Sequence, residues 1–167
     1  MEISSSSFIP LNPGLYSAKE RWNPSQIGYQ VESHTHDTFP NLDDAEIAIF
    51  NISEFEGTEN ATSSSECKVR DSLYRLYFNS LPKVVDLGHL MIMSTRKETF
   101  DLIEEVCSGL IFKGIIPVIV GGGQDISYSI YKAYAKLERA ITLCSIDSNF
   151  NLGLADDKLK SLSLIHI

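Results

Sequence analysis

Short apolar runs alternate with amphipathic segments over most of this chain. Four runs have the length and composition of buried strands: residues 45–52, 83–87, 115–120 and 140–146. Three segments between them repeat apolar side chains at helical spacing: residues 66–80, 95–114 and 126–137. Such an alternation is typical of a fold in which helices cover a mostly parallel sheet. We therefore predict an α/β fold.

Several residues mark the ends and faces of these elements. Thr95 and Glu98 have the spacing of a capping box, and Gly114 suits the left-handed position that ends the same helix. The strand at 115–120 is apolar on both faces, as a strand must be when helices cover both of its sides. In the segment 66–80, one helical face is formed by Val69, Leu73, Leu76 and Tyr77.

The first 42 residues differ in composition from the rest. They hold four of the six prolines, a run of serines and Trp22, without a clear helical or strand period. We predict an irregular N-terminal arm over 1–42 and an α/β domain over 43–167. His34 and His36 are interpreted as solvent-facing residues, because a metal site needs further ligands beside them.

Charge and composition narrow the classes of partner. The chain has 14 basic and 22 acidic side chains, and seven of the acidic ones lie between Asn41 and Glu66, where Lys and Arg are absent. An acidic chain without a basic stripe disfavours binding to nucleic acid. The apolar runs are too short to cross a membrane, and residues 1–7 do not resemble a signal peptide.

The cysteines favour a reducing compartment. Cys67, Cys107 and Cys144 are odd in number and widely spaced, so we interpret each as a small core residue of a cytoplasmic protein.

Polar and glycine-rich segments follow three of the predicted strands. They are Asp86-Leu-Gly-His89, Gly121-Gly-Gly-Gln-Asp125 and Asp147-Ser-Asn-Phe-Asn151. Ligands of open α/β sheets bind at the carboxyl ends of strands, where these segments are expected. The glycines lack the Lys-Ser/Thr of a phosphate loop and the spacing of a dinucleotide fingerprint. A tight turn without a ligand stays an open alternative.

These segments together resemble the ureohydrolase superfamily, which includes arginase, agmatinase and formimidoylglutamase. The resemblance lies in Ile119–Asp125, in Asp147–Asn151, in Asp86–His89 and in the preceding Val69–Tyr74. It implies an arginase-like three-layer fold with helices on both faces of the sheet. Residues 43–167 would then form about the first half of that fold, and the apolar run Leu162–Ile167 would be an element cut short.

The resemblance also implies metal chemistry. Ureohydrolases bind two manganese ions through histidines and aspartates and use a bridging hydroxide to hydrolyse guanidine or amidine groups. The ligand positions covered by this chain are Gln124, Asp147, Asn149 and Asn151, of which only Asp147 keeps the family's residue type. A strand-end aspartate is equally typical of a capping residue.

The resemblance also covers residues that neighbour these ligand positions in the sequence. Asp125 matches the aspartate next to the first family histidine, and Gly121, Gly122 and Gly123 form the turn. His89 stands where the family usually has aspartate, and we interpret it as a partly exposed strand-end histidine.

The substitutions indicate an altered metal site, because amides supply no negative charge to a divalent ion. We expect a ureohydrolase-like protein without catalysis of its own, with a pocket for a small polar or amidine-type ligand or with a role in assembly as a homo-oligomer. No cofactor is expected, or manganese if the site functions. The alternatives are an active divergent metal-dependent hydrolase of linear amidine C–N bonds and a generic α/β domain.

Overall fold

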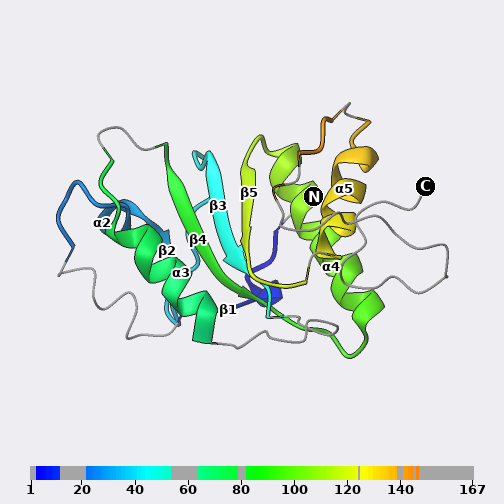
Figure 1. Cartoon of the computed structure of the whole chain (residues 1–167), viewed down its shortest axis with the longest axis horizontal. Coiled ribbons are helices and arrows are strands. Elements are labelled where there is room, and N and C mark those ends of the chain that lie inside the picture. The colour runs from blue at the N-terminus through cyan, green and yellow to red at the C-terminus, as the bar shows by residue number, and fades with distance from the viewer. Residues whose placement is uncertain are drawn as a thin grey trace.

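A computed structural model of the chain describes residues 3–11, 22–53, 64–78, 82–123, 125–138, 141–144 and 146 (Figure 1). Their helices are Ser5–Ser7 (η1, a 3-10 turn), Ile27–Gln30 (α2), Ser64–Arg75 (α3), Arg96–Phe112 (α4) and Ile126–Lys136 (α5). Their strands are Phe8–Ile9 (β1), Glu32–Ser33 (β2), Ile47–Asn51 (β3), Val84–Leu90 (β4) and Ile116–Val120 (β5). Within these residues, each helix is too short or too polar to cross a bilayer.

The five strands form one mostly parallel sheet. Its order is β1-β4-β3-β5, with β3 parallel to both β4 and β5. β1 and β2 both pair with β4. β1 runs antiparallel to it and β2 runs parallel to it. The predicted α/β fold with a mostly parallel sheet is therefore confirmed.

Helices cover both faces of this sheet. On one face, Phe50 and Leu87 pack in a core cluster with Ile103 and Leu110 of α4, and α5 packs beside α4. On the other face, Ile49 packs in a smaller cluster with residues of α2 and α3. Figure 1 shows α2 and α3 on one side of β3 and β4, with α4 and α5 on the other. The predicted three layers are confirmed in this part of the chain.

The capping box of α4 is also confirmed. The Thr95 hydroxyl accepts a hydrogen bond from the Glu98 amide at 3.2 Å, and the Glu98 carboxylate accepts one from the Thr95 amide at 3.0 Å. Gly114 follows the helix with a φ of +81°, in the left-handed region.

The N-terminal segment contributes to the sheet and to the core. Phe8 and Leu11 are buried, and β1, α2 and β2 all lie within residues 1–42. His34 is buried as well, with Nδ1 3.0 Å from the Leu87 carbonyl and its ring edge-on to Phe39. The solvent-facing interpretation is therefore wrong for His34, which follows directly on β2, and right for the exposed His36.

Of the predicted apolar face of α3, only Leu73 packs against the core, where it is half-buried. Val69 and Leu76 are 52% and 54% exposed, whereas Arg70 and Tyr74 are each 1% exposed. The helix ends at Arg75 rather than at residue 80, and Tyr77 forms an isolated bridge with Gln26. This orientation of α3 follows from an ion pair of Arg70, described below, which holds the Arg70 side of the helix against the sheet.

Two expectations about the last strands are wrong. Residues 141–144 and 146 form no strand, and Leu143 is 62% exposed. In β5, Ile116 and Val118 are 58% and 37% exposed, although Val120 at the other end packs against the α3 side of the sheet. β5 is the last strand in the order of the described sheet, so one face and one edge receive less cover than a central strand would.

The cysteines also differ from one another. Cys107 is buried in the core, and burial raises the pKa of its thiol to about 12. Cys144 is exposed, so the core interpretation is wrong there because residues 141–144 leave the sheet, and the side chain of Cys67 lies outside the described part.

Replacing Thr95 with alanine should destabilise the chain by about 1 kcal/mol, because the first turn of α4 loses its side-chain acceptor. The change is measured as the free energy of unfolding in urea. Ser94→Ala, at the exposed neighbouring position, is the control and should stay within about 0.5 kcal/mol of wild type. Equal effects of the two substitutions would contradict the capping role.

Candidate functional site

A buried carboxylate organises the carboxyl-terminal half of β4. Asp86 receives two parallel hydrogen bonds from Arg70, at 2.7 Å from Nε to Oδ2 and 3.0 Å from Nη2 to Oδ1. The side chains of Arg70 and Asp86 are 1% and 0% exposed. The Tyr74 hydroxyl donates to Oδ2 at 2.5 Å, and the Gly88 amide donates to Oδ1 at 2.9 Å. The carboxylate is thus fully engaged as an acceptor.

Arg70 extends this network to the neighbouring strand. Its Nη1 donates to Asn51 Oδ1 and its Nη2 to the Gly88 carbonyl, both at 3.2 Å. One guanidinium therefore ties the ends of β3 and β4 to α3. Burial, and then the negative charge of Asp86, raise the pKa of Tyr74 well above its ordinary value, so Tyr74 remains a hydrogen-bond donor.

Gly88 allows the close approach of β1 at this point. Its φ is +87°, and a Cβ built there would lie 2.3 Å from the Ile9 carbonyl oxygen. The register between β3 and β4 shifts at the same place, and Asn51 then pairs with His89. The glycine is needed both for the backbone angle and for the space.

His89 lies half-buried at this strand end, as the sequence interpretation expected. Burial lowers the pKa of its imidazole, and the charge of Arg70 lowers it further, against the opposite effect of Asp86. The neutral imidazole is therefore favoured in the folded chain.

The glycine turn lies at the same edge of the sheet. Asn51 pairs with Val120 on one side and with His89 on the other, so Gly121 begins close to both. Gly121 and Gly122 have φ values of +85° and +80°. The Gly123 carbonyl accepts a hydrogen bond from the Ile126 amide at 3.2 Å, which leads the chain directly into α5.

Asp125 lies in this turn, at the N-cap position of α5. Its carboxylate is buried and forms a salt bridge through Oδ2 with Arg96, the first residue of α4. Its Oδ1 has no hydrogen-bond partner among the described residues. The pair fastens the glycine turn to the start of α4.

The structure therefore brings together some of the predicted site residues. The carboxyl ends of β4 and β5, with the turn that follows β5, contain His89, Gly121, Gly122, Gly123 and Asp125. Gln124, Asp147, Asn149 and Asn151 lie outside the described residues. Sequence reasoning missed Asn51, Arg70 and Tyr74 as parts of this edge, although an arginine within a helix and an aspartate within an apolar strand are signals of a buried pair.

Metal-ligating side chains are not gathered within the described part of the chain. Across the described ranges, no three His, Cys, Asp or Glu side chains come close enough to share a metal ion. The family's ligand positions would add one carboxylate, Asp147, and three neutral amides. Hard divalent ions depend on anionic oxygen ligands for their affinity.

A comparison with protein-family models shows which family this chain belongs to. The model of the arginase family matches residues 56–161, well over half of the chain. No curated protein matches significantly.

Several solved structures share part of the fold of this chain. Formiminoglutamase of Trypanosoma cruzi with Mn²⁺ is 25% identical over 59% of this chain and 38% of its own, with a TM-score of 0.51. Formimidoylglutamase of Bacillus subtilis is 16% identical over 83% of this chain and 46% of its own, with a TM-score of 0.65. A hypothetical agmatinase of Burkholderia thailandensis is 17% identical over 75% and 44%, with a TM-score of 0.58. The chain thus spans less than half the length of these proteins.

Replacing Asp86 with asparagine should destabilise the chain by about 3–5 kcal/mol, because Arg70 is left as an uncompensated buried charge. The control is Asp71→Asn, which breaks a surface pair with Arg75 whose side chains are 41% and 65% exposed. That variant should lose no more than about 1 kcal/mol. Urea unfolding measures both, and similar small losses would contradict the organising role of Asp86.

The depressed pKa of His89 predicts a pH-dependent stability. Below its ordinary pKa of 6.5 the unfolded chain takes up a proton that the folded chain resists, so stability should fall as the pH decreases. In His89→Gln this fall should be shallower. Unfolding free energies across a pH series test it, with His36→Gln as the control for loss of an exposed imidazole. The same slope in His89→Gln and wild type would overturn the assignment.

Proposed function

Because the chain belongs to the arginase family, we propose that it is a ureohydrolase-like protein with an altered metal site and without amidine hydrolysis of its own. One observation carries this proposal. The matched region contains Gln124, Asp147, Asn149 and Asn151, which the resemblance of motifs aligns with the family's metal ligands, and three of these four are neutral amides.

The charge balance explains the expected loss. When bound, two manganese ions would supply the positive charge that activates a hydroxide for attack on an amidine carbon. Carboxylates hold such ions by offsetting that charge, and an amide oxygen offers only a dipole. Asparagine in place of aspartate at position 151 therefore removes a full negative charge where charge decides affinity.

A polar pocket is the role that these residues support instead. Amides donate and accept hydrogen bonds, so Gln124, Asn149 and Asn151 suit a small ligand that carries both kinds of group. The glycine turn would bring backbone close to that ligand, and His89 would add a neutral imidazole. A role in assembly as a cytoplasmic homo-oligomer stays a prediction of the sequence.

One observation favours a second candidate, an active divergent hydrolase with a single or rearranged metal. The T. cruzi formiminoglutamase that is 25% identical to this chain was solved with Mn²⁺. Metal content discriminates the two. If purified wild-type protein kept near-stoichiometric manganese and cleaved a linear amidine, the altered-site proposal would be wrong.

Restoring the family ligands should raise manganese affinity by about tenfold or more, since two imidazoles and one carboxylate are added. The variant is Gln124→His, Asn149→His and Asn151→Asp together, measured by calorimetric titration with MnCl₂. Ser72→Asp, at an exposed position on α3, adds the same charge elsewhere and should leave affinity unchanged. An absence of any gain in the triple variant would mean that these positions are not a metal site.

A further inference from the structure

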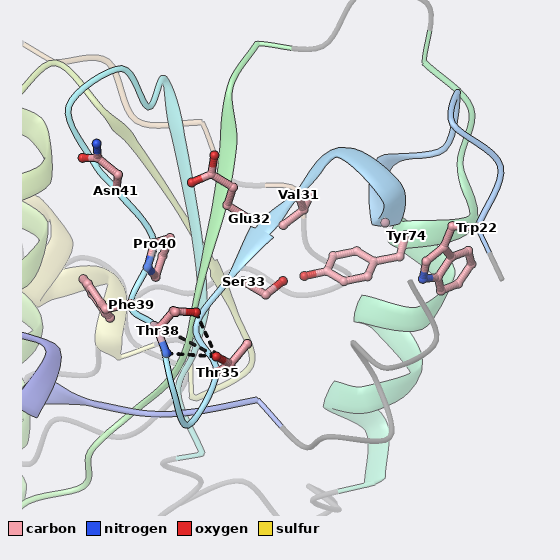
Figure 2. A pocket seen from close by; sticks show the side chains of 11 residues that line it. Trp22, Val31, Glu32, Ser33, Thr35, Thr38, Phe39, Pro40, Asn41 and Tyr74 are labelled. Atoms are coloured by element: carbon pink, nitrogen blue, oxygen red, sulfur yellow. Dashed lines mark hydrogen bonds between the residues drawn. The ribbon is translucent and has the colours of Figure 1, made fainter. Parts of the chain in front are cut away.

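A separate cavity lies beside β2, away from the glycine turn. Its volume is about 330 Å³, and α2, β2, the loop over residues 35–41 and Tyr74 of α3 form its walls (Figure 2). Figure 2 shows the Tyr74 side chain reaching from α3 toward Ser33, with Trp22 behind it. Glu32, Thr38 and Asn41 are the exposed residues of its lining.

Aromatic rings make up much of this wall. Trp22 and Tyr74 pack edge to face, with centroids 6.4 Å apart and planes at 80°. Phe39 belongs to the loop over residues 35–41 and lies on the far side of Ser33 from Tyr74 (Figure 2). Gly28 lets the two rings come close to α2, because a Cβ there would lie 2.9 Å from Tyr74 Cβ and 3.0 Å from the Trp22 ring. The rings are thereby held in fixed positions.

Glu32 supplies the formal charge of the lining. No basic side chain is among the residues that line the cavity. Lys83 approaches Glu32 from outside, at 3.9 Å, and Arg75 lies over the Trp22 ring, 5.6 Å from its centroid. Arg75 is itself paired with Asp71, and the whole chain carries a net charge of −8. Positive ligands are therefore attracted and negative ones are not.

Oxygen acceptors complete the lining. Hydroxyls of Thr35 and Thr38 lie 2.9 Å apart, and the Thr35 hydroxyl also accepts the Thr38 amide at 3.1 Å, which holds the loop in a tight turn. Asn41 adds an amide at the rim. Such oxygens accept hydrogen bonds from the N–H groups of a cation.

We propose that this cavity binds a small organic cation, an ammonium or amidinium group attached to a flat apolar body. The flat body packs against the half-buried Trp22 ring, and the charged group faces Glu32 and the hydroxyls. Cations are attracted to aromatic faces as well as to carboxylates. This site is independent of the strand-end residues and of any metal they hold.

The cavity connects to the buried ion pair through one side chain. Tyr74 lines the cavity, and its hydroxyl donates a hydrogen bond to Asp86. Ser33 forms a hydrogen bond with the same tyrosine. Because the ligand would bind the folded chain and not the unfolded one, binding should raise the unfolding temperature of the chain.

Three ligands of equal shape test the proposal with the full chain. Benzamidinium, benzamide and benzoate differ in charge and share the same ring, and calorimetry measures their affinities. Trp22 is the single tryptophan of the chain, so its fluorescence reports the cavity directly. Benzamidinium should bind about tenfold more tightly than benzoate, shift the Trp22 emission and lose affinity as salt is added.

A charge series at position 32 provides the matched variants. Glu32→Gln should weaken benzamidinium binding about threefold, since the Glu32 side chain is 50% exposed, and Glu32→Lys about tenfold. Glu105→Gln, on the exposed face of α4, is the control and should bind as wild type does. Equal affinity for all three ligands, or saturable binding that Glu32→Lys leaves unchanged, would overturn the proposal, as would the absence of binding.

Discussion

Arg70 and Asp86 form a salt bridge that is almost completely shielded from solvent, between α3 and the central strand β4. Neither charge can be left alone in that environment, so the position of α3 is fixed by the pair as much as by apolar packing. The same guanidinium reaches Asn51 and the Gly88 carbonyl, which aligns the ends of β3 and β4. The strand-end edge, with His89 and the glycine turn, depends on this alignment.

The sequence predicts the elements better than it predicts their faces. The capping box at Thr95 and the strand–helix alternation are local, and both are observed. The burial of Arg70 and His34 was missed, because their partners Asp86 and the Leu87 carbonyl lie on another element. The resemblance located the glycine turn correctly, whereas Asn51 became visible only once β3 lay between β4 and β5.

The fold of this chain and the manganese chemistry of the family have different requirements. The described residues of this arginase-family chain contain the buried network and the glycine turn. Manganese chemistry needs a cluster of anionic ligands, and the positions that the resemblance aligns with the family's ligands hold Asp147 and three amides. A scaffold of this kind keeps its concave, polar surfaces when the ions are lost, so binding of small molecules is a natural use for it.

The central claim is that this chain has the fold of the arginase family but does not form its dinuclear metal centre. Manganese binding by the wild-type chain tests this claim most directly. Electron paramagnetic resonance of free Mn²⁺ gives a sharp signal that disappears when the ions bind as a coupled pair. On adding the purified chain, the account predicts that the amplitude of this signal stays close to that of buffer. Loss of the signal at near-stoichiometric manganese would contradict it.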